Sequence, residues 1–97
     1  MEKQFCVYML ASAPRGTLYT GVTSNLVQRV AQHKEKLVDG FSARYGLDKL
    51  VWYELHDTAE TAIVREKQLK RWRRLWKIEL IETTNCHWRD LFEDVVG

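Results

Sequence analysis

The stretch that decides the fold is residues 5–22, F-C-V-Y-M-L-A-S-A-P-R-G-T-L-Y-T-G-V. Its two ends, residues 5–10 and 17–22, are rich in β-branched and aromatic side chains, and the turn-forming sequence A-S-A-P-R-G lies between them. This pattern predicts a β-hairpin. If the strands pair symmetrically about the turn, Tyr8 lies opposite or nearly opposite Tyr19, and both rings line one face of the sheet.

A helix is predicted next, over about residues 25–37. Three candidate N-cap residues stand at its start: Thr23, Ser24 and Asn25. One face then repeats at i, i+4, i+7 and i+11, with Leu26, Val30, His33 and Leu37. Asp39-Gly40 is expected to end the helix. Arg29 is four residues before His33, so both side chains lie on one helix face and can act at one site.

A third strand is predicted over residues 49–54, K-L-V-W-Y-E, after an irregular polar segment at 41–48. Asp57 and Glu60 fit a capping box for a second helix. The apolar stripe of that helix is Ala59, Ala62, Ile63 and Leu69. Glu66 lies within this stripe, where a carboxylate costs free energy unless a cation or hydrogen bonds satisfy it. Two interpretations of Glu66 are open, an edge-of-core residue paired with an Arg or a functional carboxylate.

The last predicted helix covers residues 75–82, L-W-K-I-E-L-I-E. Its apolar residues are expected to supply core or cover: Leu75, Trp76, Ile78, Leu80 and Ile81. A short C-terminal segment should then dock through Trp88, Leu91 and Phe92. The predicted order is β-β-α-β-α-α, an α+β fold in which helices flank a small three-stranded antiparallel sheet. Residues 1–97 are expected to form a single domain.

Composition favours one compact folded domain, since the 97 residues are 45% apolar and 29% charged. Cys6 and Cys86 are eighty residues apart, and no Cys/His cluster has zinc-ligand spacing, which favours a reduced, cytoplasmic protein. The longest unbroken apolar run, residues 6–11, is much shorter than the roughly 20 residues of a membrane span. We therefore expect neither secretion nor membrane insertion.

Positive charge is concentrated in residues 65–77, R-E-K-Q-L-K-R-W-R-R-L-W-K, which hold seven of the 15 basic residues and one acid. The segment carries +6, so the rest of this chain of net charge +2 carries −4. Such asymmetry is typical of a protein that binds a polyanion such as nucleic acid, although a solvated helix face has the same composition. Trp72 and Trp76, four residues apart, either stack an unpaired base or belong to the core.

The motifs V-Y-M-L in the first strand and Y-T-G in the second resemble those that name the GIY-YIG endonuclease superfamily. Tyr8 and Tyr19 match its two tyrosines. Arg29 and His33 follow Tyr19 by ten and fourteen residues, the spacing typical of the superfamily, and Glu66 resembles its metal-binding glutamate. These five residues, each on the expected helix or strand, are a more specific signal than either short motif alone.

A narrower similarity covers residues 17–77, including G-F-S-A-R-Y-G and L-V-W-Y-E. It is to the small stand-alone bacterial members, which are related to the nuclease module of the excision-repair endonuclease. The sequence departs from the family pattern in three ways. The first motif has no Gly and the second has Thr20 where Ile or Val is usual, changes that remove no functional side chain. Val22 replaces the Lys of some members, and the Asn that many members have on the helix after the metal glutamate has no aligned counterpart.

The resemblance implies a division of labour in phosphodiester hydrolysis. Glu66 would hold one Mg²⁺ or Mn²⁺ ion, with waters completing its oxygen shell. Arg29 would bind the non-bridging phosphate oxygens. Tyr8 is the preferred base, His33 would receive its proton, and Tyr19 would position the phosphate or the attacking water.

The sequence therefore predicts a Mg²⁺-dependent DNA endonuclease or nickase, with structure- or damage-directed cleavage and a place in DNA repair as options. The alternative is a non-catalytic nucleic-acid-binding module that keeps the nuclease fold. In either case the residues expected to bind the phosphate backbone are Lys67, Lys70, Arg71, Arg73, Arg74 and Lys77. The choice between DNA and RNA and the oligomeric state are left open by the sequence.

Overall fold

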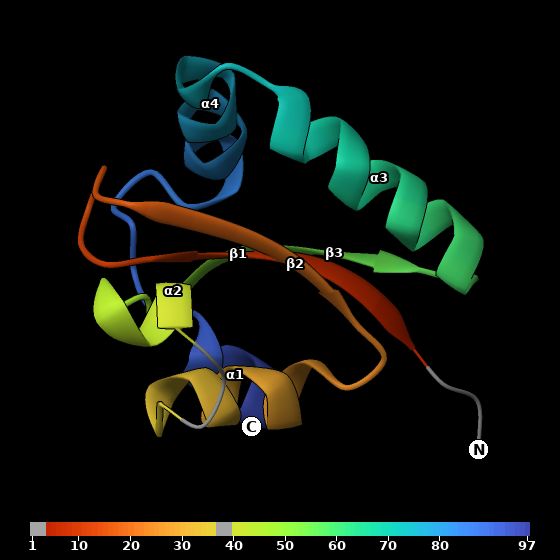
Figure 1. Cartoon of the computed structure of the whole chain (residues 1–97), viewed down its shortest axis with the longest axis horizontal. Coiled ribbons are helices and arrows are strands. Elements are labelled where there is room, and N and C mark those ends of the chain that lie inside the picture. Colours follow the sequence, from red (N-terminus) through yellow and green to blue (C-terminus); the bar gives the residue numbers. More distant parts are fainter. Residues whose placement is uncertain (1–3, 37–39) are drawn as a thin grey trace.

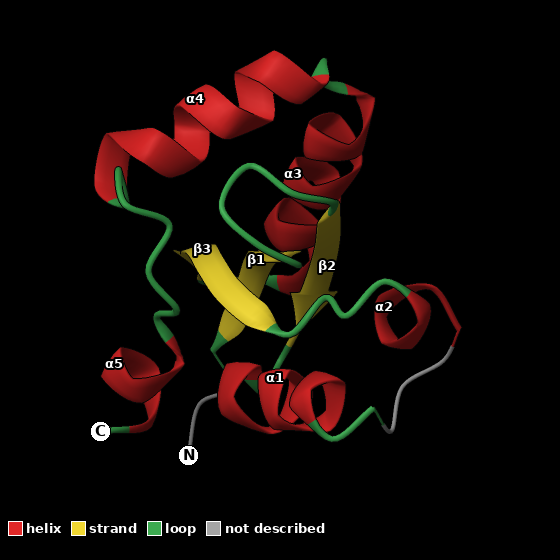
Figure 2. Cartoon of the chain, turned by 90° about the vertical axis from the view of Figure 1, so that its left-hand side faces the viewer, coloured by secondary structure: helices red, strands yellow, loops and turns green. Residues whose placement is uncertain are grey.

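The computed structural model describes residues 4–36 and 40–97, in which an antiparallel three-stranded sheet lies between two layers of helices (Figures 1 and 2). The sheet has the order β2-β1-β3. Its strands are β1 (Phe5–Ala11), β2 (Leu18–Thr23) and β3 (Lys49–His56). One face is covered by α3 (Ala59–Arg71) and α4 (Arg74–Thr84), and the other by α1 (Leu26–Lys34), α2 (Gly40–Arg44) and α5 (Phe92–Val96). The predicted α+β fold is confirmed.

Two short helices, α2 and α5, are additions to the predicted order. Each has five residues, too few for a helical repeat to be recognised in the sequence, and α2 replaces part of the segment predicted to be irregular. At the start of α1, the Asn25 side chain accepts a hydrogen bond from the Gln28 N–H at 3.1 Å, so one of the three candidate caps is used. Leu37 and Asp39, at the predicted end of this helix, lie outside the described residues.

The central strand β1 is buried on both faces, and its alternating side chains feed two separate core clusters. Towards α3 and α4 it contributes Val7, Met9 and Ala11. Towards α1 and α5 it contributes Cys6, Tyr8 and Leu10. Because the second cluster includes Tyr8, a polar hydroxyl is carried into the layer between the sheet and α1. No helix among residues 4–36 and 40–97 is long and apolar enough to cross a membrane.

Helix α3 differs from its prediction at its cap and in its stripe. Thr58, not Asp57, is the N-cap, and its hydroxyl accepts a hydrogen bond from the Thr61 N–H at 3.2 Å. Ala62 and Leu69, seven residues apart on one face, are fully buried against the sheet. Ile63 is 41% exposed because it is turned about 100° from Ala62 around the helix axis.

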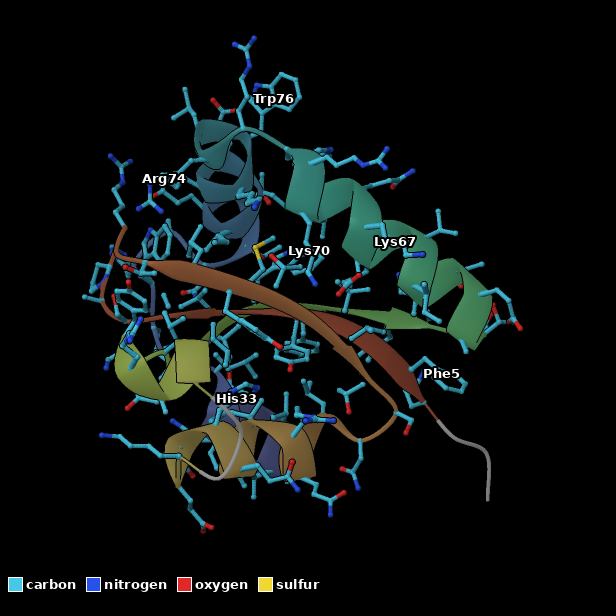
Figure 3. The ribbon with its side chains drawn as sticks, viewed as in Figure 1. Phe5, His33, Lys67, Lys70, Arg74 and Trp76 are labelled. Atoms are coloured by element: carbon cyan, nitrogen blue, oxygen red, sulfur yellow. The ribbon has the colours of Figure 1, made fainter. Side chains whose placement is uncertain are left out.

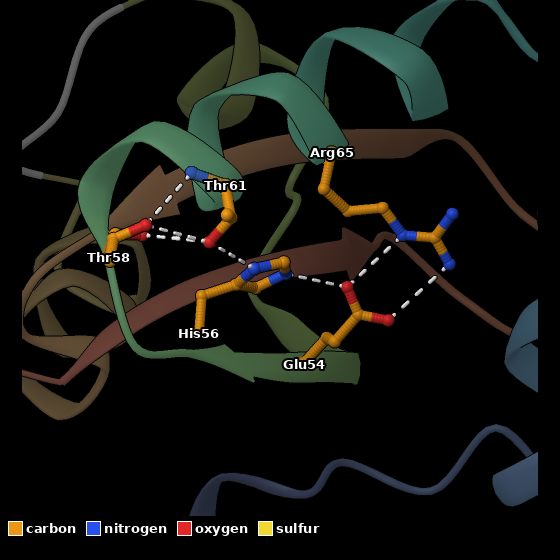
Figure 4. A network of polar contacts seen from close by, with 5 residues as sticks. All are labelled: Glu54, His56, Thr58, Thr61 and Arg65. Atoms are coloured by element: carbon orange, nitrogen blue, oxygen red, sulfur yellow. Dashed lines mark hydrogen bonds and ion pairs between the residues drawn. The ribbon is translucent and has the colours of Figure 1, made fainter.

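A polar network fixes α3 to the end of β3 (Figure 4). His56 Nε2 donates to Glu54 at 2.7 Å, and Arg65 Nε donates to the same carboxylate oxygen at 3.1 Å. On the other side of the imidazole, His56 Nδ1 lies 3.0 Å from the hydroxyl of Thr61, next to the cap residue Thr58. The network therefore joins the first two turns of α3 to β3 and restricts rotation of the helix that carries Glu66.

Helix α4 packs on the core through Ile78 and Ile81, whereas Leu75 and Trp76, predicted as core or cover, are 61% and 49% exposed. On a helix of 3.6 residues per turn Trp76 lies about 140–160° away from the two isoleucines, so it faces outward when they face the sheet. The eight-residue pattern is apolar on most sides, and the sequence alone does not specify which side is buried.

The C-terminal segment covers the outer edge of β3. The Leu91 N–H donates to the Leu50 carbonyl at 2.7 Å, and the predicted docking of Trp88 is confirmed by its burial. Asp90 accepts hydrogen bonds from the Leu50 N–H and from Lys34 Nζ on α1, the latter at 2.6 Å. Burial alone would raise the pKa of Asp90, but these hydrogen bonds outweigh it and lower that pKa. This segment therefore ties α1 to β3.

The hairpin register sets Tyr8 opposite Gly21, and Tyr19 opposite Leu10. Tyr8 and Tyr19 are thus two positions out of direct opposition, yet they share a face, with ring centroids 6.2 Å apart. A Cβ atom added at Gly21 would lie 2.6 Å from the Tyr8 hydroxyl oxygen and 2.9 Å from Tyr19 Cε1. Only glycine at this position therefore lets the Tyr8 ring cross β2.

Replacement of Gly21 by Ala should displace the Tyr8 ring and lower the free energy of unfolding by about 1–3 kcal/mol, as overpacking does. Urea unfolding measures the loss, and near-ultraviolet circular dichroism reports the tyrosine environment. Gly40→Ala is the matched control, since an added Cβ there meets nothing within 4 Å. Equal stability of Gly21→Ala and the parent would show that the ring has room to move.

Candidate active site

Four of the predicted site residues come together on the α1 side of the sheet. Tyr8 and Tyr19 belong to the hairpin and pack in the core cluster on this side. His33 lies on α1, below the sheet in the view of Figure 3. The Tyr8 hydroxyl lies 3.1 Å from His33 Nε2. The His33 ring lies 5.9 Å from the Tyr8 ring and 5.2 Å from the Tyr19 ring, measured between centroids. The three rings therefore form one contiguous aromatic cluster with a hydrogen bond at its centre.

Burial controls the protonation of this cluster. Tyr8 is 1% exposed and His33 is 4% exposed. Burial, assisted by the neighbouring Tyr19, raises the pKa of Tyr8 well above its usual value. Burial and then the charge of Arg29 lower the pKa of His33, so the imidazole is neutral at pH 7. In the tautomer with its proton on Nδ1, His33 accepts the Tyr8 hydroxyl proton in a hydrogen bond at Nε2.

Arg29 is the exposed member of the group. It lies one turn before His33 on α1, and its charge acts on both buried residues: it lowers the pKa of His33 and opposes the rise in the pKa of Tyr8. A guanidinium at the surface beside a buried phenol is well placed for an anion that approaches from solvent. The predicted proximity of Arg29 and His33 is thus a feature of the folded chain.

Glu66 lies on α3, in the opposite helical layer, with its side chain 13% exposed. Its carboxylate is paired with Lys70 one turn further on, at 2.7 Å, rather than with an arginine. The charge of Glu66 contributes to the raised pKa of Tyr8, so the carboxylate is within electrostatic reach of the phenol. Glu66 therefore influences Tyr8 through its charge, as the smallest of the causes of that pKa shift.

The donor chemistry at Glu66 fits a hard divalent cation. Carboxylate oxygen is the ligand that Mg²⁺ prefers, and a partly buried carboxylate already accommodates one cation, the Lys70 ammonium. Among residues 4–36 and 40–97 no group of three or more His, Cys, Asp or Glu side chains is arranged for a metal. An ion would thus be held by Glu66 with waters and substrate oxygens, the usual manner for Mg²⁺.

Of the residues predicted to bind the phosphate backbone, some make contacts within the protein and others are exposed. Arg74 donates to the hairpin-turn carbonyls of Arg15 and Gly16, the second at 2.6 Å. Lys70 is paired with Glu66, and Arg73 stacks 5.6 Å from the centre of the Trp76 ring. Burial, then Arg74 and Lys70, lower the pKa of Lys77. Lys67 and Arg71 are exposed on α3.

Two contributors to the site were not singled out in the sequence, although each carried a signal. A glycine inside a strand is a sign of close approach by another group, which is the role of Gly21 beneath Tyr8. The spacing of Glu66 and Lys70 is that of an ion pair on one helix face. Lys70, one of the cations of the basic segment, is therefore paired with the Glu66 carboxylate.

The chain is similar to UPF0213 proteins of bacteria and of a virus. A UPF0213 protein from Syntrophus aciditrophicus (strain SB) is 34% identical over 86 residues, which is 84% of this chain and 93% of that protein. A UPF0213 protein of Autographa californica nuclear polyhedrosis virus is 51% identical over 35 residues, 36% of this chain and 33% of that protein. The solution NMR structure of a UPF0213 protein from Bacillus halodurans shares the fold, with a TM-score of 0.56 and 23% identity over 90% of this chain and 92% of that one.

The family model of the GIY-YIG catalytic domain matches residues 4–79, which include both tyrosines, the α1 residues, Glu66 and the whole basic segment at 65–77. The resemblance found in the sequence is confirmed, and the chain belongs to the GIY-YIG nuclease domain family.

Proposed function

We propose that this protein is a metal-dependent endonuclease or nickase that hydrolyses phosphodiester bonds in DNA. The observation that carries the proposal is the 3.1 Å contact between the Tyr8 hydroxyl and a neutral His33, beside the exposed cation of Arg29. This is the geometry of a proton donor, a proton acceptor and an anion-binding group at one site. Family membership supports the nuclease class, and the exposed cations of α3 support a polyanionic substrate.

The proton transfer begins at Tyr8. Its hydroxyl proton passes to His33 Nε2, and the resulting phenolate oxygen accepts a proton from the attacking water. The hydroxide then attacks phosphorus, the bond to the leaving oxygen breaks, and that oxygen takes a proton from a solvent water. The proton held by His33 returns to solvent and restores the neutral imidazole. Since burial raises the pKa of Tyr8, the phenolate forms only when positive charge stabilises it, and Arg29 already acts in that direction.

Two further residues complete the arrangement. Arg29 offers a planar fork to the non-bridging oxygens of the phosphate, which neutralises the charge that develops on them. Tyr19, partly buried beside His33, positions the phosphate or the water. Glu66 would hold the divalent cation, which when bound supplies positive charge at the phosphate and the leaving oxygen.

A second candidate function is a non-catalytic nucleic-acid-binding module on the same fold. Two observations favour it: Tyr8 is almost completely buried, and Lys70 neutralises Glu66. Incubation with labelled duplex, single-stranded, flap and junction DNA, with Mg²⁺, Mn²⁺ or EDTA, separates the candidates. Cleavage that EDTA abolishes supports the nuclease, and binding with no cleavage under any condition supports the module. The same panel tests for structure-directed cleavage, and the same duplex carrying a single lesion tests for damage-directed cleavage of the kind that a role in repair requires.

Glu66→Gln tests the cation site. It should retain the fold and DNA binding but lose metal-dependent cleavage, because the amide is a poor ligand for a hard cation. Isothermal titration with Mn²⁺ should show the loss of one site. The matched control is Glu60→Gln, an exposed acid on α3. Full cleavage by Glu66→Gln would remove Glu66 from the chemistry.

Substitution of the phenols and the imidazole tests the proton relay. Tyr8→Phe should lose cleavage by orders of magnitude, since the ring packing survives while the hydroxyl does not. His33→Ala should slow the reaction by about 10² to 10⁴ and move the pH optimum upward, because the phenol must lose its proton unaided. Tyr19→Phe should fall between them. Rates are compared at saturating DNA and metal, with circular dichroism to confirm folding. An inactive Tyr19→Phe beside an active Tyr8→Phe would reverse their roles.

The salt dependence of DNA binding tests the basic segment. With about four to six phosphates contacted, the slope of log K against log salt should be roughly −4 to −5 on duplex DNA. Lys67→Ala with Arg71→Ala should flatten this slope by up to about two units, because both side chains are exposed. Lys36→Ala, on the opposite side of the molecule, is the control. A slope near zero for the parent would contradict binding through this segment.

A further inference from the structure

A groove at the junction of α3 and α4 takes no part in the chemistry described above. It is lined by Trp72, Trp76, Glu79, Leu80 and Thr83 and has a volume of about 430 Å³. That volume lies within the range of small-molecule binding sites, about 300–1,000 Å³. Trp76 lies at the end of the molecule remote from His33 (Figure 3), so the groove is separate from the candidate active site.

Two indole rings dominate this groove. Trp72 is partly buried against the core, whereas Trp76 is 49% exposed on the side of α4 that faces away from it. The rings meet edge to face, with centroids 6.1 Å apart and planes at 85°. A half-exposed tryptophan braced by a second, anchored one presents a fixed flat surface to solvent, which is what a stacking partner requires.

The charges around the groove select the kind of ligand. Arg73 lies over the Trp76 ring, 5.6 Å from its centre, and Arg65 lies over the Trp72 ring, 5.3 Å from its centre, so each ring has a guanidinium over one face. Glu79, by contrast, belongs to the lining. An anion is therefore attracted to the guanidinium groups and repelled from the Glu79 side of the groove. A neutral flat group attached to a phosphate matches this distribution of charge.

We propose that the groove binds an unpaired base of a single-stranded arm of the nucleic-acid substrate. The base stacks on the exposed part of the Trp76 ring, and its flanking phosphates contact the guanidinium of Arg73 beside it. Bases within a duplex are stacked on one another and offer no free face, so the ligand is a single-stranded arm, as in a flap or an overhang. The inference rests on the proposed function and adds a substrate class to it: nucleic acid that joins a duplex to a single strand.

The test is equilibrium binding of the full chain in EDTA, measured by fluorescence anisotropy. Three labelled probes are compared: a blunt duplex, the same duplex with a single-stranded arm, and the same armed duplex with abasic residues throughout the arm. The parent should bind the base-bearing arm about 5- to 100-fold more tightly than the abasic one, because one base is stacked. Trp76→Ala should abolish this preference and leave the affinity for the blunt duplex within about twofold.

Two variants serve as controls. Leu75→Ala removes a neighbouring exposed apolar side chain that does not line the groove, and it should retain the full preference. Trp76→Phe keeps an aromatic face and should retain part of it. A preference lost in both Trp76→Ala and Leu75→Ala would contradict a specific role for the groove.

The remaining outcomes separate this inference from the proposed function. If the parent binds the blunt duplex but does not distinguish the two arms, the stacking site is wrong and the nuclease proposal stands. Binding of no probe by the parent would overturn both. If sedimentation shows a dimer that Trp76→Ala converts to a monomer, the groove accommodates a second copy of the chain, and the base-binding inference is wrong.

Discussion

The position of the Tyr8 ring over Gly21 is the constraint on which the candidate site depends. The ring can cross β2 only because residue 21 has no Cβ, and its hydroxyl then reaches His33 on the next helix along the chain. A slip of the hairpin by one residue would send Tyr8 to the opposite face of the sheet. The hydrogen bond between Tyr8 and His33 therefore requires both the observed hairpin register and the packing of α1 against the sheet.

In the proposed mechanism, the same burial that fixes Tyr8 also keeps the free protein inactive. It raises the pKa of the phenol and lowers the pKa of its hydrogen-bond partner His33, so proton transfer between them is unfavourable until positive charge arrives. Arg29 supplies part of that charge, and Lys70 shields the carboxylate of Glu66 that opposes it. The Lys70 side chain is 54% exposed, so its ammonium can return to water when a divalent cation takes its place at Glu66.

The sequence predicts the position of a side chain best where local strand or helix geometry alone determines it. Tyr8 and Tyr19 fall on one face because strand side chains alternate, and Arg29 precedes His33 by one helical turn wherever the helix packs. The sequence predicts least where packing between elements determines which side chains are buried. Which side of α4 meets the sheet decides that Trp76 is exposed, and five-residue helices have no period to detect.

The hairpin is held at its turn and at the middle of β1, by helices of the two opposite layers. At the turn, Arg74 donates to the carbonyls of Arg15 and Gly16, and Arg15 Nε donates to Glu82 at 3.0 Å. Both partners belong to α4, the helix that carries Trp76. At the middle of β1, Tyr8 contacts His33 of α1. The two strands that carry both tyrosines are therefore fixed both to the helix of the candidate active site and to the helix of the groove.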